Sequence, residues 1–66
     1  MTKKDYIAIA DALNHTLEVT REWGADRVAA SEATLITYNT LVGLFTLDNE
    51  RFQEETFRKA VFDKTA

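Results

Sequence analysis

The sequence contains no cysteine, no proline, two glycines and one histidine among its 66 residues. Without cysteine there is no disulfide and no thiolate ligand for a metal ion. The single histidine, His15, cannot build a histidine-rich metal site. The lack of proline and the scarcity of glycine favour long uninterrupted helices. We therefore expect a helical protein that binds neither a metal nor a cofactor.

The chain also lacks a long apolar run and a large excess of either charge. Its formal net charge of −3 argues against a nucleic-acid binder, whose affinity comes mostly from neutralising phosphates. No stretch approaches the ~20 apolar residues of a membrane span. The apolar run from Tyr6 to Ala10 is too short for an export signal, and Asp5 and Asp11 bracket it. These features, with the absence of cysteine, indicate a protein of the cytoplasm.

The length predicts one domain, residues 1–66, of marginal stability, because so short a chain buries only about 60% of its unfolded surface. Small domains without disulfides or metals depend on good helix packing or on a second subunit.

Apolar spacing predicts the first helix from about Lys3. Tyr6, Ile9, Ala10 and Leu13 lie at i, i+3, i+4 and i+7, which places them on one side of a helix. Thr2 and Asp5 have the spacing of a capping box at its start. Gly24 suits the left-handed position just past its end.

The second predicted helix runs from Asp26, a candidate cap, to Leu47. Its apolar side consists of Leu35, Tyr38, Leu41, Val42 and Phe45. Many β-branched residues between positions 34 and 44 make a strand the rival interpretation. Strict alternation fails there, since Leu35 and Ile36 are neighbours.

The third predicted helix is short and ends near Phe62. It starts either after Asn49, a good cap residue, or after Gln53, a poor one. The second start places Phe52 and Phe57 at the two positions of a hydrophobic staple.

The predicted fold is therefore all-α, with two long antiparallel helices and a short third helix in a small bundle. Leu13, Leu41 and Phe45 lie at the centres of facing stripes and are expected to be buried. The third helix is too short to cover the whole hairpin. The apolar groove near the Gly24 turn is therefore expected to contact another chain. The residues expected there are Leu17, Trp23, Val28 and Leu35. For Trp23, which flanks the apolar stripe of the first helix, packing in the core is the rival interpretation.

An acidic face is the other candidate contact surface. Glu18 and Glu22 are four residues apart, with Asp11 nearby. Paired carboxylates catalyse only where their pKa is perturbed, so the common interpretation is a solvated helix face. The functional alternative is an acidic surface that meets a basic groove on a partner.

Other candidate chemistry is weak. His15 lies opposite the Leu13 stripe, and Ser31 has no flanking nucleophile signature. The basic residues near the carboxyl end are diluted by neighbouring glutamates, which disfavours DNA binding. Those basic residues are Arg51, Arg58 and Lys59, and the glutamates are Glu50, Glu54 and Glu55.

Both ends of the chain resemble a family of short phage-encoded proteins, whose members begin K-K-D-Y-x-x-I-A and end D-N-P-R-F-D-x-x-R-F. The matching residues are Lys3, Lys4, Asp5, Tyr6, Ile9 and Ala10 at the start, and Asp48, Asn49, Arg51, Phe52 and Phe57 near the end. Glu50 replaces the usual proline, and Gln53 replaces the aspartate that would cap the last helix. Because of these two differences, the resemblance does not decide where the last helix starts. The family has no assigned activity. The resemblance implies a phage origin, a setting in the host cytoplasm and no catalytic residue.

These observations favour a non-enzymatic protein that binds another protein, such as a host defence or transcription factor. The residues expected to contact it are Trp23, Val28, Leu35, Glu18 and Glu22. The alternatives are a homodimer that fills the groove with its own copy and, less favoured, a small DNA-binding regulator.

Overall fold

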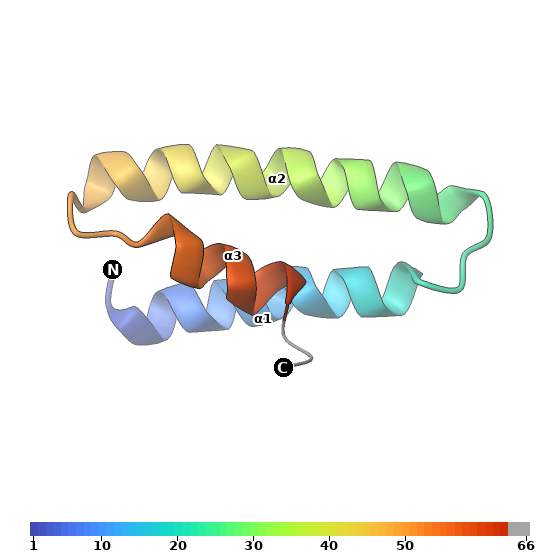
Figure 1. Ribbon diagram of the computed structural model, residues 1–66, viewed down its shortest axis with the longest axis horizontal. Helices are drawn as coiled ribbons and strands as arrows, with labels where there is room; N and C mark the ends of the chain where they lie inside the picture. Colours follow the sequence, from blue (N-terminus) through green and yellow to red (C-terminus); the bar gives the residue numbers. More distant parts are fainter. Residues whose placement is uncertain (64–66) are drawn as a thin grey trace.

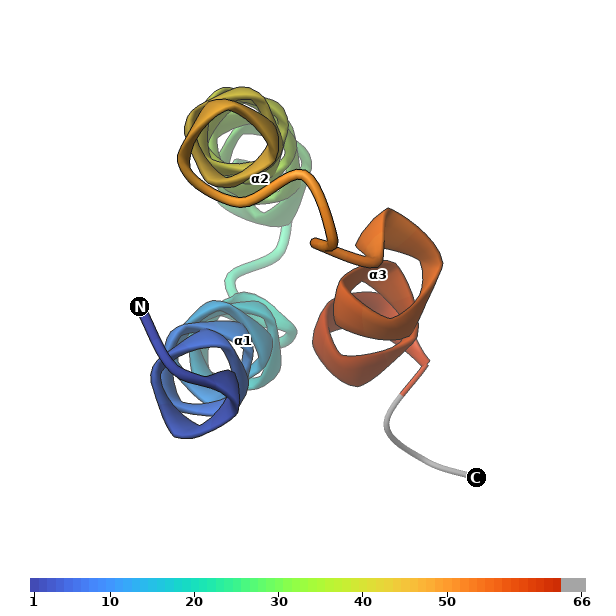
Figure 2. The ribbon, with the colours of Figure 1, turned by 90° about the vertical axis from the view of Figure 1, so that its left-hand side faces the viewer.

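The computed structural model describes residues 1–63, and these form helices α1 (Lys3–Thr20), α2 (Asp26–Asp48) and α3 (Glu54–Phe62), with no strand in that range. Figure 1 shows α1 and α2 side by side along the long axis, joined by a turn at one end. Seen along that axis, α3 lies against the pair and completes a triangle of helices (Figure 2). The all-α class and the small helical bundle are confirmed.

The threonine-rich middle of the chain is helical throughout, so the strand interpretation was wrong. Thr34, Thr37 and Thr40 donate their hydroxyls to carbonyl oxygens four residues earlier, at 2.9, 3.0 and 3.0 Å. Thr46 does the same at 2.8 Å. Because each hydroxyl has a partner inside the helix, these β-branched polar residues fit there.

The turn between α1 and α2 is longer than the tight connection of Gly24 and Ala25 that the sequence predicts. α1 ends at Thr20, and residues 21–25 form the turn. Gly24 has a φ of 64°, so its left-handed conformation is confirmed. The capping prediction for Asp26 was wrong, since Asp26 is the first helical residue and Ala25 precedes it. The first three backbone amides of α2 donate to carbonyl oxygens of the turn at 3.1 to 3.4 Å, which removes the need for a side-chain cap.

The starts of α1 and α3 agree with the capping box and the hydrophobic staple that the sequence predicts. The amide of Thr2 donates to Asp5 Oδ2 at 2.8 Å at the start of α1. α3 starts after Gln53, the second of the two predicted starts. The rings of Phe52 and Phe57 lie 5.7 Å apart, which is the contact expected of a hydrophobic staple.

Six of the seven aromatic residues form one cluster where α3 meets the two long helices. We call it the aromatic cluster, and it consists of Tyr6, Tyr38, Phe45, Phe52, Phe57 and Phe62. Val61 of α3 is fully buried beside it. The core is therefore concentrated at the α3 end of the molecule.

Phe45 is buried as predicted, whereas Leu13 and Leu41 are only half-buried. The physical reason is the position of α3. Its side chains Phe57 and Val61 occupy the centre of the core, so the two leucines pack at its margin. Toward the turn, the buried side chains are the small polar residues Thr20 and Thr34.

A hydrogen bond from α1 secures the end of α3. Asn14 Nδ2 donates to the carbonyl oxygen of Val61 at 2.7 Å. This carbonyl lies in the last turn of α3 and has no partner within the helix.

We expect Asn14→Ala to lower the free energy of unfolding by about 0.5–1.5 kcal/mol, because the carbonyl loses its donor. Asn14→Asp should lower it further, since a carboxylate cannot donate and lies at the negative end of a helix dipole. Urea denaturation measures both, and Thr16→Ala, an exposed change on the same helix, is the control. An Asn14→Asp variant as stable as wild type would contradict this role.

Candidate interaction surfaces

Three of the residues expected at a partner contact are apolar and exposed. Trp23, Val28 and Leu35 are 54%, 58% and 47% exposed. We call them the turn-end residues, because Trp23 lies in the turn and the other two lie in the half of α2 nearest to it. Trp23 is the one aromatic residue outside the aromatic cluster.

The hollow near the turn differs from the apolar groove that was expected. Its volume is about 270 Å³. Its lining is mainly polar and consists of Asn14, Leu17, Glu18, Arg21, Arg27, Ser31 and Phe62. Of the four apolar residues expected in the groove, only Leu17 lines it. The polar lining follows from the periodicity of α2. The inner side of this helix, which carries Tyr38 and Thr34, continues toward the turn through Ser31 and Arg27, at successive spacings of four, three and four residues. The inner side is therefore polar near the turn.

The acidic pair is also arranged differently from the prediction. Glu18 is exposed on α1 and lines the polar hollow together with Arg21 and Arg27. Glu22 lies in the turn beyond the end of α1, so the two carboxylates do not share a helix face. Both glutamates are exposed, and both are close in sequence to Trp23. Glu18 therefore belongs to a surface of mixed charge and not to an acidic stripe.

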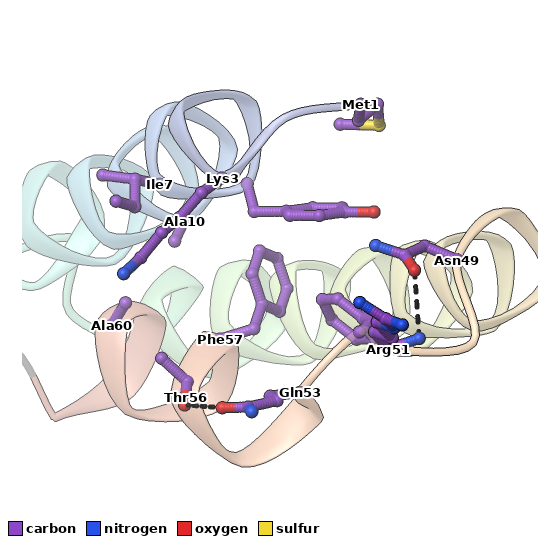
Figure 3. Close-up of a pocket in the computed structure, with 12 residues that line it drawn as sticks. Met1, Lys3, Ile7, Ala10, Asn49, Arg51, Gln53, Thr56, Phe57 and Ala60 are labelled. Atoms are coloured by element: carbon purple, nitrogen blue, oxygen red, sulfur yellow. Dashed lines mark hydrogen bonds between the residues drawn. The ribbon is translucent and has the colours of Figure 1, made fainter.

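A second hollow, of about 350 Å³, lies between α1 and α3 beside the loop that precedes α3 (Figure 3). Its floor includes Ala10 and Phe57, and its charged lining residues are Lys3 and Arg51. In the loop, the Arg51 amide donates to the Asn49 side chain at 3.0 Å. The hydroxyl of Tyr6, another lining residue, is buried and has no hydrogen-bond partner within residues 1–63. No sequence pattern indicated this hollow, because it forms only where the loop passes the start of α1.

Among the described residues, Tyr38 is the titratable side chain whose pKa is clearly shifted, and Glu54 is its hydrogen-bond partner. The Tyr38 hydroxyl donates to Glu54 Oε2 at 3.1 Å. Burial and then the hydrogen bond and negative charge of Glu54 raise the pKa of Tyr38 to about 12, against a smaller lowering by Arg58. Tyr38 is packed against Phe57 at a ring separation of 5.6 Å. The pair therefore stabilises the contact between α2 and α3.

The raised pKa of Tyr38 predicts a loss of stability in alkali. The folded pKa of about 12 exceeds the unfolded value of 10.0, so the folded state retains the proton. Its contribution, ~2–3 kcal/mol, is complete below pH ~10 and disappears as the pH rises to ~12. Urea denaturation over this pH range should show the loss in wild type and in Tyr6→Phe, but not in Tyr38→Phe. The same alkaline loss in Tyr38→Phe would contradict the assignment.

The remaining candidates carry little chemistry. His15 is exposed, and Ser31 lines the polar hollow without a histidine among its lining residues. Arg58 and Lys59 pair with Glu55 at 3.9 and 3.7 Å, which dilutes a basic face on α3. Within residues 1–63 there is no group of acidic, cysteine or histidine side chains that could hold a metal ion. In the same range, no helix has both the length and the apolar character needed to cross a membrane.

Comparison with known proteins gave no match to a family model, to a curated protein or to a solved structure. The functional argument therefore depends on the residues and geometry described above.

Proposed function

We propose that this chain is a small phage-type protein, without enzymatic activity, that binds another protein in the cytoplasm of the host cell. The proposed partner is a host defence or transcription factor. The observation that carries the proposal is the exposure of Trp23, 54% of whose side chain faces solvent while every other aromatic residue belongs to the core cluster. Tryptophan is enriched among residues that dominate binding energy at protein interfaces.

The composition around Trp23 supports a protein partner. Val28 and Leu35 add apolar area that gains free energy when it leaves water, at roughly 25 cal/mol per Å². Glu18 and Glu22 add charges at the margin, where charged groups set the rate and specificity of association. An apolar centre with a polar rim is the usual composition of a protein interface.

The proposal takes α1 and α2 as an antiparallel pair, so that the turn projects at the end away from the core. The short link of residues 21–25 supports this arrangement. So does the ion pair between the Met1 amino group and Asp48 Oδ2 at 3.5 Å, which brings the start of α1 to the end of α2.

The test is capture of a partner from host lysate by immobilised wild-type protein and by matched variants. We expect Trp23→Ala and Leu35→Glu to reduce capture at least tenfold without changing the melting temperature. Ile7→Ala is the matched control, because Ile7 is 49% exposed on α1 and distant in sequence from the turn. Phe57→Ala should instead lower the melting temperature. Equal capture by wild type, Trp23→Ala and Leu35→Glu would contradict the proposed surface.

A further inference from the structure

α2 carries a second apolar stripe on the side away from the aromatic cluster. Its members follow one another at spacings of four, three, four, three and four residues, and we call them the outer stripe: Ala29, Ala33, Ile36, Thr40, Gly43 and Leu47. All six are exposed, as is Leu44 beside them. Leu47, Ile36 and Leu44 are 88%, 66% and 56% exposed. No charged residue occurs from position 33 to position 47.

Packing within the monomer does not account for this stripe. The core uses the opposite side of α2, where Thr34, Tyr38 and Phe45 are buried. Side chains placed about half a turn away cannot reach that core. A helix that is apolar on both sides is typical of a helix buried on both sides. Moreover, the alternation of four and three residues is the spacing of a seam between two packed helices.

We propose that the outer stripe packs against the outer stripe of a second copy, with the two α2 helices antiparallel. This inference goes beyond the proposed function, because it uses neither Trp23, Val28 nor Leu35. The order of large and small side chains along the stripe is complementary to itself when two copies are antiparallel, which is why the partner is a second copy. A two-fold axis at the level of residue 38 places Leu47 opposite Ala29 of the other copy, and Ile36 opposite its Thr40.

The same axis places Ala33 opposite Gly43 of the other copy. Each layer thus combines a large side chain with a smaller one, or two small ones, as interdigitation requires. Apart from its chain neighbours and the adjacent helix backbone, a Cβ atom added at Gly43 would meet no atom of the monomer within 4 Å, so that position faces open space. Small residues there allow the two helices to approach closely.

The charged residues beside the outer stripe are compatible with this antiparallel pairing. Glu32 is the only charged residue flanking the stripe between positions 29 and 47, and the axis places it near Leu44 and Thr46 of the second copy. No acidic side chain therefore lies opposite another along the seam. Asn39 comes beside Asn39 of the second copy, where two amides can donate to and accept from each other.

The size of the stripe sets the expected strength. From Ala29 to Leu47 the helix is ~27 Å long and ~10–12 Å wide, which gives a footprint of ~300 Å² on each copy. This lies below the ~800 Å² per partner of a standard stable interface. We therefore expect a weak, reversible dimer that forms only at high protein concentration.

Sedimentation equilibrium from ~1 μM to ~1 mM tests the dimer, since a weak association becomes populated toward the upper end of this range. Wild type should pass from monomer to dimer mass. Ile36→Glu should remain monomeric throughout, with an unchanged melting temperature in dilute solution. Ile7→Glu, a matched change at an exposed isoleucine of α1, should dimerise as wild type does. A wild type that stays monomeric, or an Ile36→Glu variant that dimerises equally well, would overturn the proposal.

The orientation has its own test, because the chain has no cysteine. A mixture of Ala33→Cys and Gly43→Cys proteins should form the mixed disulfide at least tenfold faster than either protein forms a disulfide with itself. Faster self-coupling of each variant would indicate a parallel pair and overturn the register. Ile36→Glu should leave partner capture from lysate intact, so failure of the dimer and failure of the proposed function are distinguishable.

Discussion

Phe57→Ala is expected to remove most of the stability of this protein. Phe57 is 4% exposed, and its ring lies 5.6, 5.4 and 5.7 Å from the rings of Tyr38, Phe45 and Phe52. Truncation of a buried phenylalanine costs ~3–5 kcal/mol, because it loses apolar burial and leaves a cavity. A single core in a chain this small rarely supplies more than ~3–5 kcal/mol.

Circular dichroism during urea denaturation measures the effect. Phe62→Ala is the matched control, since Phe62 belongs to the same cluster but is 41% exposed and, within residues 1–63, has one ring contact, with Tyr38. Phe62→Ala should lower the free energy of unfolding clearly less than Phe57→Ala does. If Phe57→Ala lost no more stability than Phe62→Ala, the aromatic cluster would not be the centre of the core.

Tyr6→Phe is expected to have the opposite sign and to stabilise the protein. The ring of Tyr6 packs 4.9 Å from Phe45 and 5.1 Å from Phe52, and phenylalanine keeps both contacts. The Tyr6 hydroxyl is buried without a hydrogen-bond partner within residues 1–63. An unsatisfied buried hydroxyl costs ~1–3 kcal/mol, and its removal should recover a gain of that order.

Tyr38→Phe is the matched comparison, because it removes a hydroxyl that does have a partner. Loss of the bond to Glu54 should destabilise the protein by ~1.5–3 kcal/mol, the range for a hydrogen bond to a charged group. Melting temperatures at neutral pH compare the two variants. A Tyr6→Phe protein that melts below wild type would show that its hydroxyl contributes a favourable interaction.

The helices and their class could be predicted from the sequence, because they depend on local spacing. Tyr6, Ile9 and Ala10 identified the inner side of α1, and Tyr38 and Phe45 identified that of α2. The start of α3 stayed open, since Asn49 and Gln53 both fit as its beginning. The contact of Phe52 with Phe57 decided it, and that contact depends on tertiary packing.

The candidate site could be predicted only in part. The short third helix favoured an interface role for Trp23, core packing was the rival interpretation, and its exposure of 54% decides against the core. The polar lining of the hollow near the turn was not predicted, although Arg27 and Ser31 lie on the same side of α2 as Tyr38. The bond from Asn14 to Val61 spans 47 positions, and no local pattern reports such a contact.

The central claim is that folding leaves Trp23 outside the core and available to a partner. Its fluorescence tests this directly, because it is the only tryptophan in the chain. In dilute folded protein, the emission should be that of a solvent-exposed indole, readily quenched by acrylamide and little changed by unfolding in urea. A blue-shifted emission that resists acrylamide in the dilute folded monomer, and shifts to the red on unfolding, would contradict the account.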